Sequence, residues 1–341
     1  MFSPIVIRPD GEGRRRMIER IVIGVVVLVV TSQLLGAQAG RGLPEKDGGA
    51  AQVRLEASVR MFAETIGPRS HRDPKNLAAA AEFITRSFES SGYSVTVQPY
   101  EADGLPVRNI IAERRGTEQP DRVLIVGAHY DTVEGTPGAD DNASGVAVLL
   151  ELARQHAQTR FRKTVRFVAF TLEEPPFFRS RHMGSRVYAR SLKAKGEQVE
   201  AMVCLEMVGY YSNEESSQSF PFFWLRWRYP TRGNFLTVVS NSASQALQTQ
   251  VFDALKAQMA LPVEAFTGPW WIPGVDLSDH GSFWKEGYPA VMLTDTAFYR
   301  NPHYHQSTDR PETLDYGAMT ELVQGMSGVL MALNQAPEGS R

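Results

Sequence analysis

The segment GAHYDTVEGTPGADDNASG, residues 127–145, contains the residue types from which metal sites and acid–base sites are built. Its one histidine is His129, and its acidic residues include Asp131, Asp140 and Asp141. Carboxylates held this close together repel one another unless a positive charge lies between them. We therefore expect a positively charged group, such as a metal ion, among these side chains.

The same residue types follow three other apolar stretches that are typical of strands. Glu173 and Glu174 follow TVRFVAF, Glu206 follows AMVCL, and His303 and His305 lie a few residues beyond PAVMLT. In open α/β sheets, functional groups collect at the carboxyl ends of the strands. The spacing therefore predicts a cluster of histidines and carboxylates at one edge of a sheet, which is the arrangement of a metal site on a rigid scaffold.

Histidine and carboxylate ligands without thiolates favour zinc or a similar divalent ion. Cys204, the only cysteine, lies in the apolar run AMVCLEMV, so we expect a buried thiol and neither a disulfide nor a thiolate cluster. Two zinc ions about 3.5–4 Å apart need a carboxylate that both share. The residues alone leave Asp140 and Asp141 open for that position. Ser144 is expected to cap the helix that follows.

The pattern of apolar stretches predicts an α/β fold. Strands are expected at stretches that are apolar or alternate with polar residues, namely 94–100, 107–113, 122–128, 164–170, 201–207, 234–240 and 289–294. Helices are expected at amphipathic stretches, namely 51–66, 76–91, 144–158, 183–195, 242–260 and 313–335. Strands that alternate with helices form largely parallel sheets covered on both faces. We therefore predict a three-layer αβα sandwich around a mixed, largely parallel sheet.

The chain divides into a leader, a linker and one large domain. Residues 1–39 join the charged run RRRMIER, the apolar run IVIGVVVLVV and a small-residue pattern, which is typical of a signal peptide. A retained membrane anchor over residues 21–37 is the alternative. Residues 40–50 are expected to form a linker, and residues 51–341 a single domain. Inside it, the irregular stretch 208–232 is rich in aromatic residues, and a loop of this length is usually functional or flexible.

Charge and composition narrow the possible partners. A net charge of −2 over 341 residues, with no basic tract interleaved with aromatic residues, gives no reason to expect nucleic-acid binding. The leader predicts an extracytoplasmic protein, periplasmic or secreted, whose membrane contact is confined to residues 21–37 if they are not cleaved. Four tryptophans are expected to serve as packing residues rather than as a substrate wall, namely Trp224, Trp227, Trp270 and Trp271.

Six motifs, in order, resemble the co-catalytic di-zinc aminopeptidase family of metallopeptidases, family twenty-eight. The motifs are GAHYDT, GADDNASG, LEEPP, LEMVGY, SDHGSFW and YHQSTD, and the resemblance covers about residues 66–333. The relatives of this family include secreted bacterial aminopeptidases, glutamate carboxypeptidases, glutaminyl cyclases and a receptor ectodomain. The resemblance implies a zinc exopeptidase fold of the phosphorylase/hydrolase-like kind.

The resemblance also implies a set of metal ligands. His129 and Glu206 would hold one zinc ion, Glu174 and His305 the other, and Asp141 would bridge them. This choice prefers Asp141 over Asp140 and His305 over His303, which spacing alone does not decide. By the same likeness, the peptide bond after Asp141 would be cis.

Further roles follow from the same likeness. Glu173 would be the general base, and Asp131 would fix the orientation of the His129 imidazole. Asp279 and His280 are expected either to orient the substrate or to cap a short helix. The segment IPGVDLSDH lacks the cysteines and the tyrosine that secreted aminopeptidases carry there. Tyr299 or Tyr304 would then have to assist the oxyanion.

The sequence thus predicts an exported aminopeptidase that uses two zinc ions and acts on peptides with a free N-terminus. Three alternatives stay open at this point. A glutaminyl cyclase would use one zinc ion, a carboxypeptidase would act at the other end of the peptide, and a receptor-like ectodomain would not be catalytic. Because the predicted ligands and the base are all present, the non-catalytic alternative is the weakest.

Overall fold

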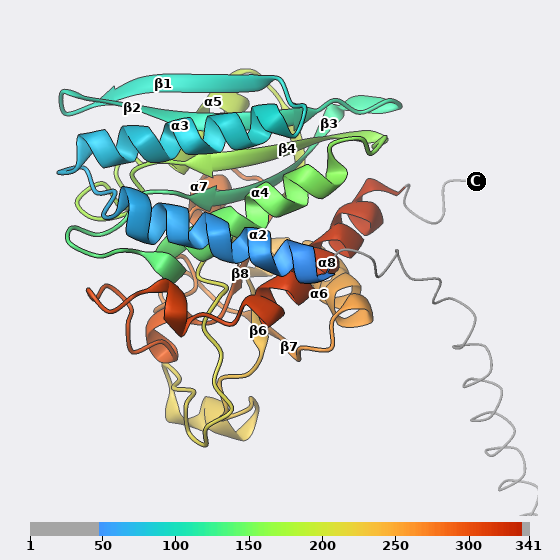
Figure 1. Cartoon of the computed structure of the whole chain (residues 1–341). Coiled ribbons are helices and arrows are strands. Elements are labelled where there is room, and N and C mark those ends of the chain that lie inside the picture. Colours follow the sequence, from blue (N-terminus) through green and yellow to red (C-terminus); the bar gives the residue numbers. More distant parts are fainter. Residues whose placement is uncertain (1–47, 336–341) are drawn as a thin grey trace, which may run out of the picture. The chain divides into compact units, whose positions relative to one another are not determined.

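The computed structural model describes residues 48–335 (Figure 1). The predicted leader and most of the predicted linker lie outside these residues. The helix expected from residue 51 begins earlier, because α2 spans Gly48–Arg60 and continues as a π-helical turn over Met61–Ile66. Within the described residues, no helix combines the length and apolarity needed to cross a bilayer.

The centre of the fold is an eight-stranded sheet in the order β1-β2-β4-β3-β5-β8-β6-β7. The four central strands β4, β3, β5 and β8 run parallel to one another. The pairs β1–β2, β2–β4 and β6–β8 are antiparallel. The strand bounds are β1 Val95–Ala102, β2 Leu105–Arg114, β3 Gln119–His129, β4 Lys163–Phe170, β5 Gln198–Leu205, β6 Leu236–Ser240, β7 Val263–Thr267 and β8 Ala290–Thr294. The prediction of a mixed sheet with a parallel centre is confirmed.

Helices cover both faces of this sheet, so the three-layer prediction is also confirmed. Figure 1 shows the larger helical layer in front of the sheet, with α2, α3, α4 and α8, while α5 and α7 lie behind it. The remaining helix bounds are α3 Pro74–Ser90, α4 Gly145–His156, α5 Gly184–Ala194, α6 Gln245–Gln258, α7 His280–Lys285 and α8 Tyr316–Asn334.

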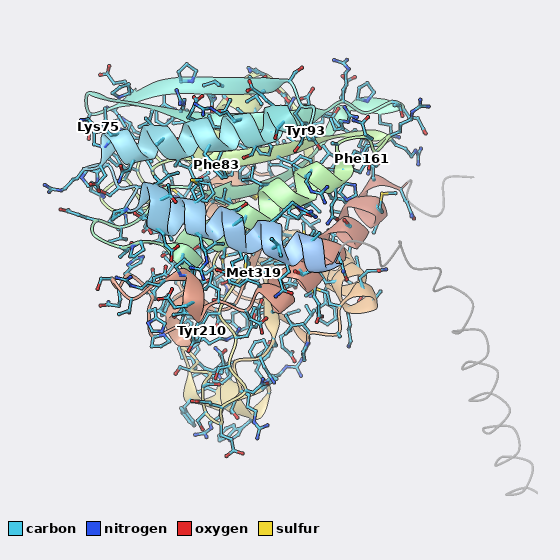
Figure 2. All side chains as sticks on the ribbon, in the orientation of Figure 1. Lys75, Phe83, Tyr93, Phe161, Tyr210 and Met319 are labelled. Carbon is cyan, nitrogen blue, oxygen red and sulfur yellow. The ribbon has the colours of Figure 1, made fainter. Side chains whose placement is uncertain are left out.

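The sheet has an apolar core on each face, because successive side chains of a strand point to opposite sides. In β3, Leu124 and Val126 join the core under the larger helical layer, whereas Val123 and Ile125 join the core under α5 and α7. Successive side chains of a strand point to opposite faces, so a central strand covered on both sides has to be apolar throughout. Figure 2 shows Met319 of α8, fully buried, on the larger helical side.

Two local expectations differ from the structure. The edge strand β7 was not predicted, because five residues carry too little periodicity, and the short helix α7 was expected only as one of two alternatives at Asp279 and His280. Ser144 does not cap α4: it is itself helical, and its hydroxyl donates to the carbonyl of Asp140 at 2.8 Å. The backbone of Asp141 and Asn142 is not helical, so the helical run begins after Asn142, whose Oδ1 accepts a hydrogen bond from the Gly145 N–H at 3.2 Å.

Candidate metal centre

The predicted site residues meet at the carboxyl edge of the parallel strands. His129 is the last residue of β3, Glu174 lies four residues beyond the end of β4, and Glu206 directly follows β5. These three strands are neighbours that run in the same direction. The sheet therefore brings together residues that are far apart in the sequence, as the strand-end pattern predicts.

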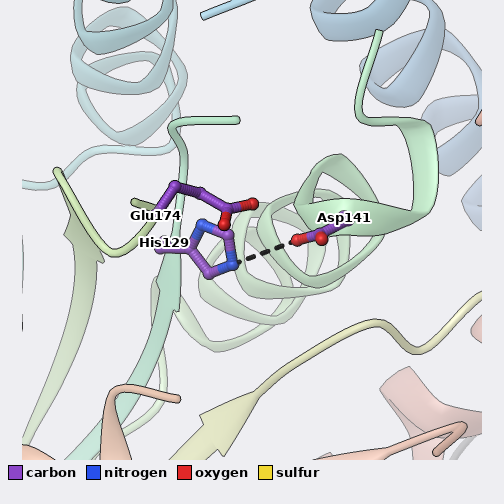
Figure 3. Close-up of side chains that lie close together, drawn as sticks. All are labelled: His129, Asp141 and Glu174. Carbon is purple, nitrogen blue, oxygen red and sulfur yellow. Dashed lines mark ion pairs between the residues drawn. The ribbon is translucent and has the colours of Figure 1, made fainter. Parts of the chain in front are cut away.

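Two pairs of potential ligands surround the carboxylate of Asp141. On one side, His129 Nε2 lies 3.4 Å from Asp141 Oδ1 and 3.3 Å from Glu206 Oε2. On the other side, His305 Nε2 lies 3.2 Å from Asp141 Oδ2 and 3.4 Å from Glu174 Oε2. Figure 3 shows His129, Asp141 and Glu174 converging from separate segments. Each oxygen of Asp141 thus faces one histidine.

The chemistry and spacing of these atoms fit zinc. Two ligands bound at 2.0–2.1 Å to a tetrahedral ion lie about 3.3–3.4 Å apart, which matches the distances between these donors. His129 Nε2 and Glu174 Oε1 are buried and have no hydrogen-bond partner within residues 48–335. Buried polar atoms are rarely left without a partner, so these two atoms point to a missing cation.

The electrostatics of the cluster also call for positive charge. Burial, and then the charge of Asp141, raises the pKa of Glu174 to about 8. Burial would raise the pKa of Asp141 too, but the adjacent imidazoles of His129 and His305 hold it below its usual value. The charge of Glu206 and contacts with Asp131 and Asp141 outweigh burial and raise the pKa of His129 well above its usual value. A divalent cation would relieve the repulsion that these shifts record.

The loop that carries Asp141 is held by its backbone. The carboxylate of Asp309 accepts hydrogen bonds from the backbone N–H groups of Asp140 at 2.8 Å and Asp141 at 3.0 Å. Gly138 has a φ of +60°, and a side chain there would collide with the carbonyl of Asp141. The peptide bond between Asp141 and Asn142 is cis, as predicted.

The structure also shows where Asp140 and His303 lie, the two residues that spacing alone left as alternatives to Asp141 and His305. The side chain of Asp140 accepts hydrogen bonds from Gly209 N–H at 2.9 Å and from the Asn301 amide at 2.7 Å, away from the histidines. His303 points elsewhere, with Nδ1 2.9 Å from the Thr308 hydroxyl. The geometry therefore favours Asp141 and His305.

Asp131 contacts both the imidazole of His129 and the turn that carries Glu173. Its carboxylate accepts hydrogen bonds from the backbone N–H groups of Glu173 at 3.0 Å and Glu174 at 3.1 Å. Its Oδ1 lies 3.5 Å, and its carbonyl oxygen 3.2 Å, from His129 Nδ1. Burial, opposed in part by His129, raises the pKa of Glu173 well above its usual value. Asp131 is thus placed to orient the imidazole and the turn that carries Glu173.

The predicted substrate residues occupy different surroundings. Asp279 and His280 are fully buried. His280 Nε2 lies 2.7 Å from the carbonyl of Val275, and Asp279 makes no capping hydrogen bond to α7. Tyr299 is half-buried, and its hydroxyl donates to the carbonyl of Pro273 at 3.2 Å. Tyr304 stacks on the ring of His305, with the ring centroids 3.7 Å apart.

Two supporting residues were missed, although both lie inside motifs that the sequence displays. Ser278, the first residue of SDHGSFW, donates its hydroxyl to Glu206 Oε2 at 2.6 Å. Asp309, the last residue of YHQSTD, holds the Asp141 loop as described above. A position beside a candidate ligand is the signal that could have identified them, because ligands are usually oriented by a second hydrogen-bonding residue.

An apolar cavity of about 120 Å³ opens beside the cluster. Glu206 and Tyr304 line its inner end. Its other walls come from β6–β8, from the segment before α7 and from the aromatic stretch, and include Phe220, Leu225, Val239, Phe266, Val275, Met292 and Tyr299. The stretch 208–232 therefore has one side that faces the candidate site.

Residues 109–330 match the sequence profile of Peptidase family M28. A protein of Escherichia coli K12, YfbL, printed as uncharacterized, is 43% identical over 296 residues, which are 84% of this chain and 90% of that protein. A probable leucine aminopeptidase of Arthroderma otae is 28% identical over 67% of this chain, and the match spans 58% of that relative.

Solved structures share the fold. The zinc aminopeptidase BSAP of Bacillus subtilis aligns with a TM-score of 0.68 at 17% identity, over 88% of this chain and 98% of that one. The glutaminyl cyclase of Porphyromonas gingivalis aligns with a TM-score of 0.60 at 24% identity, over 83% and 97% of the two chains. At these identities the likeness concerns the fold, so it does not choose between the two activities.

Proposed function

The chain belongs to Peptidase family M28 and is a metallopeptidase-type hydrolase, and from this premise we propose that it is a two-zinc aminopeptidase. The main support for two ions is that each carboxylate oxygen of Asp141 faces its own pair of potential zinc ligands. His129 and Glu206 would hold one ion, and His305 and Glu174 the other. A single-zinc enzyme needs only one such set.

The residues of the chain then have distinct tasks. Bound zinc supplies the Lewis acidity that polarises a carbonyl and lowers the pKa of a water molecule. Glu173 takes the proton of the attacking water and passes it to the leaving amine. Asp131 holds the His129 ring, and Ser278 holds Glu206, so that both keep their orientation during turnover.

The cavity beside the cluster supports a preference for a large apolar N-terminal side chain. A cavity of about 120 Å³ with mainly apolar walls is close in size to an engineered cavity of about 150 Å³ that binds benzene. Leucine and phenylalanine side chains fit such a space, whereas an acidic side chain would lose its hydration beside the carboxylates of Glu206 and Glu264. Because Glu206 lines the inner end, the bound residue would lie next to the proposed metal ligands.

A substrate panel with metal counting tests this function. Leucine and phenylalanine anilides should be cleaved, alanine anilide more slowly, and N-acetylated peptides not at all. Removal of metal with a strong chelator should abolish cleavage, and zinc should restore it. A stoichiometry near one ion, with cyclisation of glutaminyl peptides, would establish the cyclase instead, and cleavage of N-blocked peptides at their C-terminus would establish a carboxypeptidase.

We also propose that the protein is exported. The support is the succession of basic residues, a short apolar run and small residues within residues 1–39. Fractionation of the native host, with mass measurement of the mature N-terminus, tests this. A chain that starts near residue 40 outside the cytoplasm fits a cleaved leader, an intact membrane-bound chain fits an anchor over residues 21–37, and an intact cytoplasmic chain contradicts export.

A further inference from the structure

The segment Phe222–Arg228, here called the aromatic tip, exposes large apolar side chains. Phe223 is 67% exposed, Trp224 49% and Trp227 77%. The expectation that these two tryptophans serve as packing residues is therefore wrong. Figure 1 shows the segment, in yellow, projecting from the end of the molecule that lies opposite β1. Side chains of this size rarely lie together in water unless they contact something else.

The tip has two faces with different surroundings. Phe223–Trp227 form a 3₁₀ turn, in which side chains three residues apart lie above one another. Leu225 points inward and lines the apolar cavity. Trp224 and Trp227 lie on another face and do not line that cavity. The exposed rings are therefore not used by the proposed substrate site.

The exposed rings hold one another in place. Phe222 stacks on Trp224 with an interplanar angle of 3° and a centroid distance of 4.8 Å. Phe223 meets Trp227 edge to face at 5.6 Å. Such contacts restrict the side chains before any partner is bound, which lowers the entropy lost on binding.

The charged residues of the tip stretch itself are all basic, although the carboxylate of Glu264 lies near Arg228. Residues 216–233 contain three arginines and no acidic residue. Arg232 pairs with Glu215 at 2.9 Å, just outside this stretch. Arg226 and Arg228 are exposed, and neither forms an ion pair with a residue of the described range. The partner of this surface should therefore be apolar and negatively charged.

We propose that the aromatic tip docks into the interfacial region of an anionic phospholipid bilayer. Tryptophan and phenylalanine lie at the boundary between headgroups and acyl chains, and arginines bind the anionic headgroups. A stable protein interface uses about 20–30 residues on each side, far more than this projecting turn offers. Because Leu225 lines the cavity from the other face of the same turn, docking would hold the substrate cavity beside the membrane surface.

A fluorescent label on the tip tests this in the full chain. Cys204 is fully buried, so a thiol-reactive, environment-sensitive dye would label only the introduced cysteine of F223C. Vesicles of phosphatidylcholine with phosphatidylglycerol should shift the dye emission to the blue, and a quencher on the lipid chains should quench it. Vesicles of phosphatidylcholine alone should have a much smaller effect. A K195C label, at an exposed position after α5, is the control and should not respond.

Binding of variants to the same vesicles separates charge from insertion. W224S/W227S should weaken vesicle binding about tenfold or more. R226Q/R228Q should weaken it by a similar factor and reduce its salt dependence, because each arginine near an anionic surface contributes about fivefold. The matched controls V53S and K195Q each remove one exposed apolar or basic side chain elsewhere, and they should bind as the parent does. All four variants should keep the far-ultraviolet circular dichroism spectrum of the parent, which reports that they fold.

Three results would overturn the proposal. The chain could bind vesicles while the tip label stays unchanged, in which case another segment makes the contact. The label could respond to protein concentration without lipid, in which case the tip contacts a second copy of the chain. Vesicle binding could also be the same in the tip variants and the controls. None of these readouts depends on the proposed peptidase activity.

Discussion

The histidine–carboxylate cluster proposed to bind zinc and the aromatic tip both border one apolar cavity. Their side chains differ in burial and in the contacts that hold them. In the cluster, His129, Asp141 and Glu206 are each less than a tenth exposed, and nearby hydrogen bonds fix their positions. In the tip, Trp224 is 49% and Trp227 77% exposed, and each contacts a neighbouring phenylalanine ring. Polar groups are buried in one region, and apolar groups are exposed in the other.

This contrast indicates that the two regions have different functions. Buried, mutually oriented carboxylates are costly to fold and are kept where chemistry needs fixed geometry. Exposed rings cost little in folding and are suited to a contact made after folding. Substitutions in the cluster should therefore affect turnover, and substitutions in the tip should affect binding of the protein to a membrane. Four experiments test that difference in function.

The largest effect is expected for Glu173→Gln. Glutamine keeps the shape of the side chain but cannot take a proton, so turnover of leucine anilide should fall by about 10²–10⁴-fold. The metal content should not change, because Glu173 is not one of the proposed ligands. Steady-state kinetics together with elemental analysis of the purified variant measure both quantities.

Glu134→Gln is the matched control for this substitution. Glu134 is exposed and pairs with Arg72 at 2.8 Å, outside the cluster. It should retain the activity of the parent. If Glu173→Gln were as active as Glu134→Gln, Glu173 would not be the general base.

The cluster could be predicted because strand ends are easy to locate. Apolar runs fix where β3, β4 and β5 end, and parallel pairing then places His129, Glu174 and Glu206 at one edge. The choice of Asp141 over Asp140 could not be made from spacing, since adjacent residues differ only in direction. It depends on the path of the loop, which the long-range contact with Asp309 fixes.

The tip could not be predicted for a related reason. Its composition resembles that of a core segment, and exposure is a property of the whole fold rather than of local pattern. The edge strand β7, Val263–Thr267, was missed likewise, because a short partly exposed strand has little alternation to detect. Ser144 shows a different error: the helical backbone begins before it, and Asn142 rather than Ser144 accepts a hydrogen bond from a backbone N–H at the start of the helix.

The same substitution should reduce stability strongly in the apolar core under α5 and α7 and little in the tip. Phe283→Ala removes a fully buried ring that contacts Phe170 and Tyr188, so the free energy of unfolding should fall by about 3–5 kcal/mol. Phe223→Ala removes a ring that is 67% exposed, and the change should stay within about 0.5 kcal/mol. Urea denaturation followed by circular dichroism measures both. Equal losses would mean that the tip is part of the core.

A buried histidine outside the cluster should respond to acid in its own way. His156, at the end of α4, contacts the hydroxyls of Ser327 and Thr159 and no carboxylate of residues 48–335, and burial lowers its pKa from 6.5 to about 4. Below pH 6.5 the unfolded chain therefore takes up a proton that the folded chain refuses. Stability is lost as the pH falls toward 4, with no further loss from this group below that.

Replacing this histidine with glutamine should remove that part of the acid sensitivity. The parent should lose about 2–3 kcal/mol more than His156→Gln between pH 6.5 and pH 4. Urea denaturation at several pH values measures the difference, in which groups common to both proteins cancel. Parallel curves for the two proteins would show that His156 is protonated in the folded chain.

Leu225 lies where the two regions meet, and its replacement should change selectivity rather than catalysis. The side chain lines the cavity from the tip, so Leu225→Trp would fill part of the space proposed for the N-terminal side chain. The value of kcat/KM for leucine and phenylalanine anilides should fall about tenfold relative to alanine anilide, since a lost apolar contact of this size is worth 1–3 kcal/mol. Leu225→Ala, which enlarges the cavity, should leave alanine anilide unaffected and favour phenylalanine over leucine. A uniform loss on all three substrates in both variants would mean that the tip supports the metal cluster itself, and the division between the two regions would then fail.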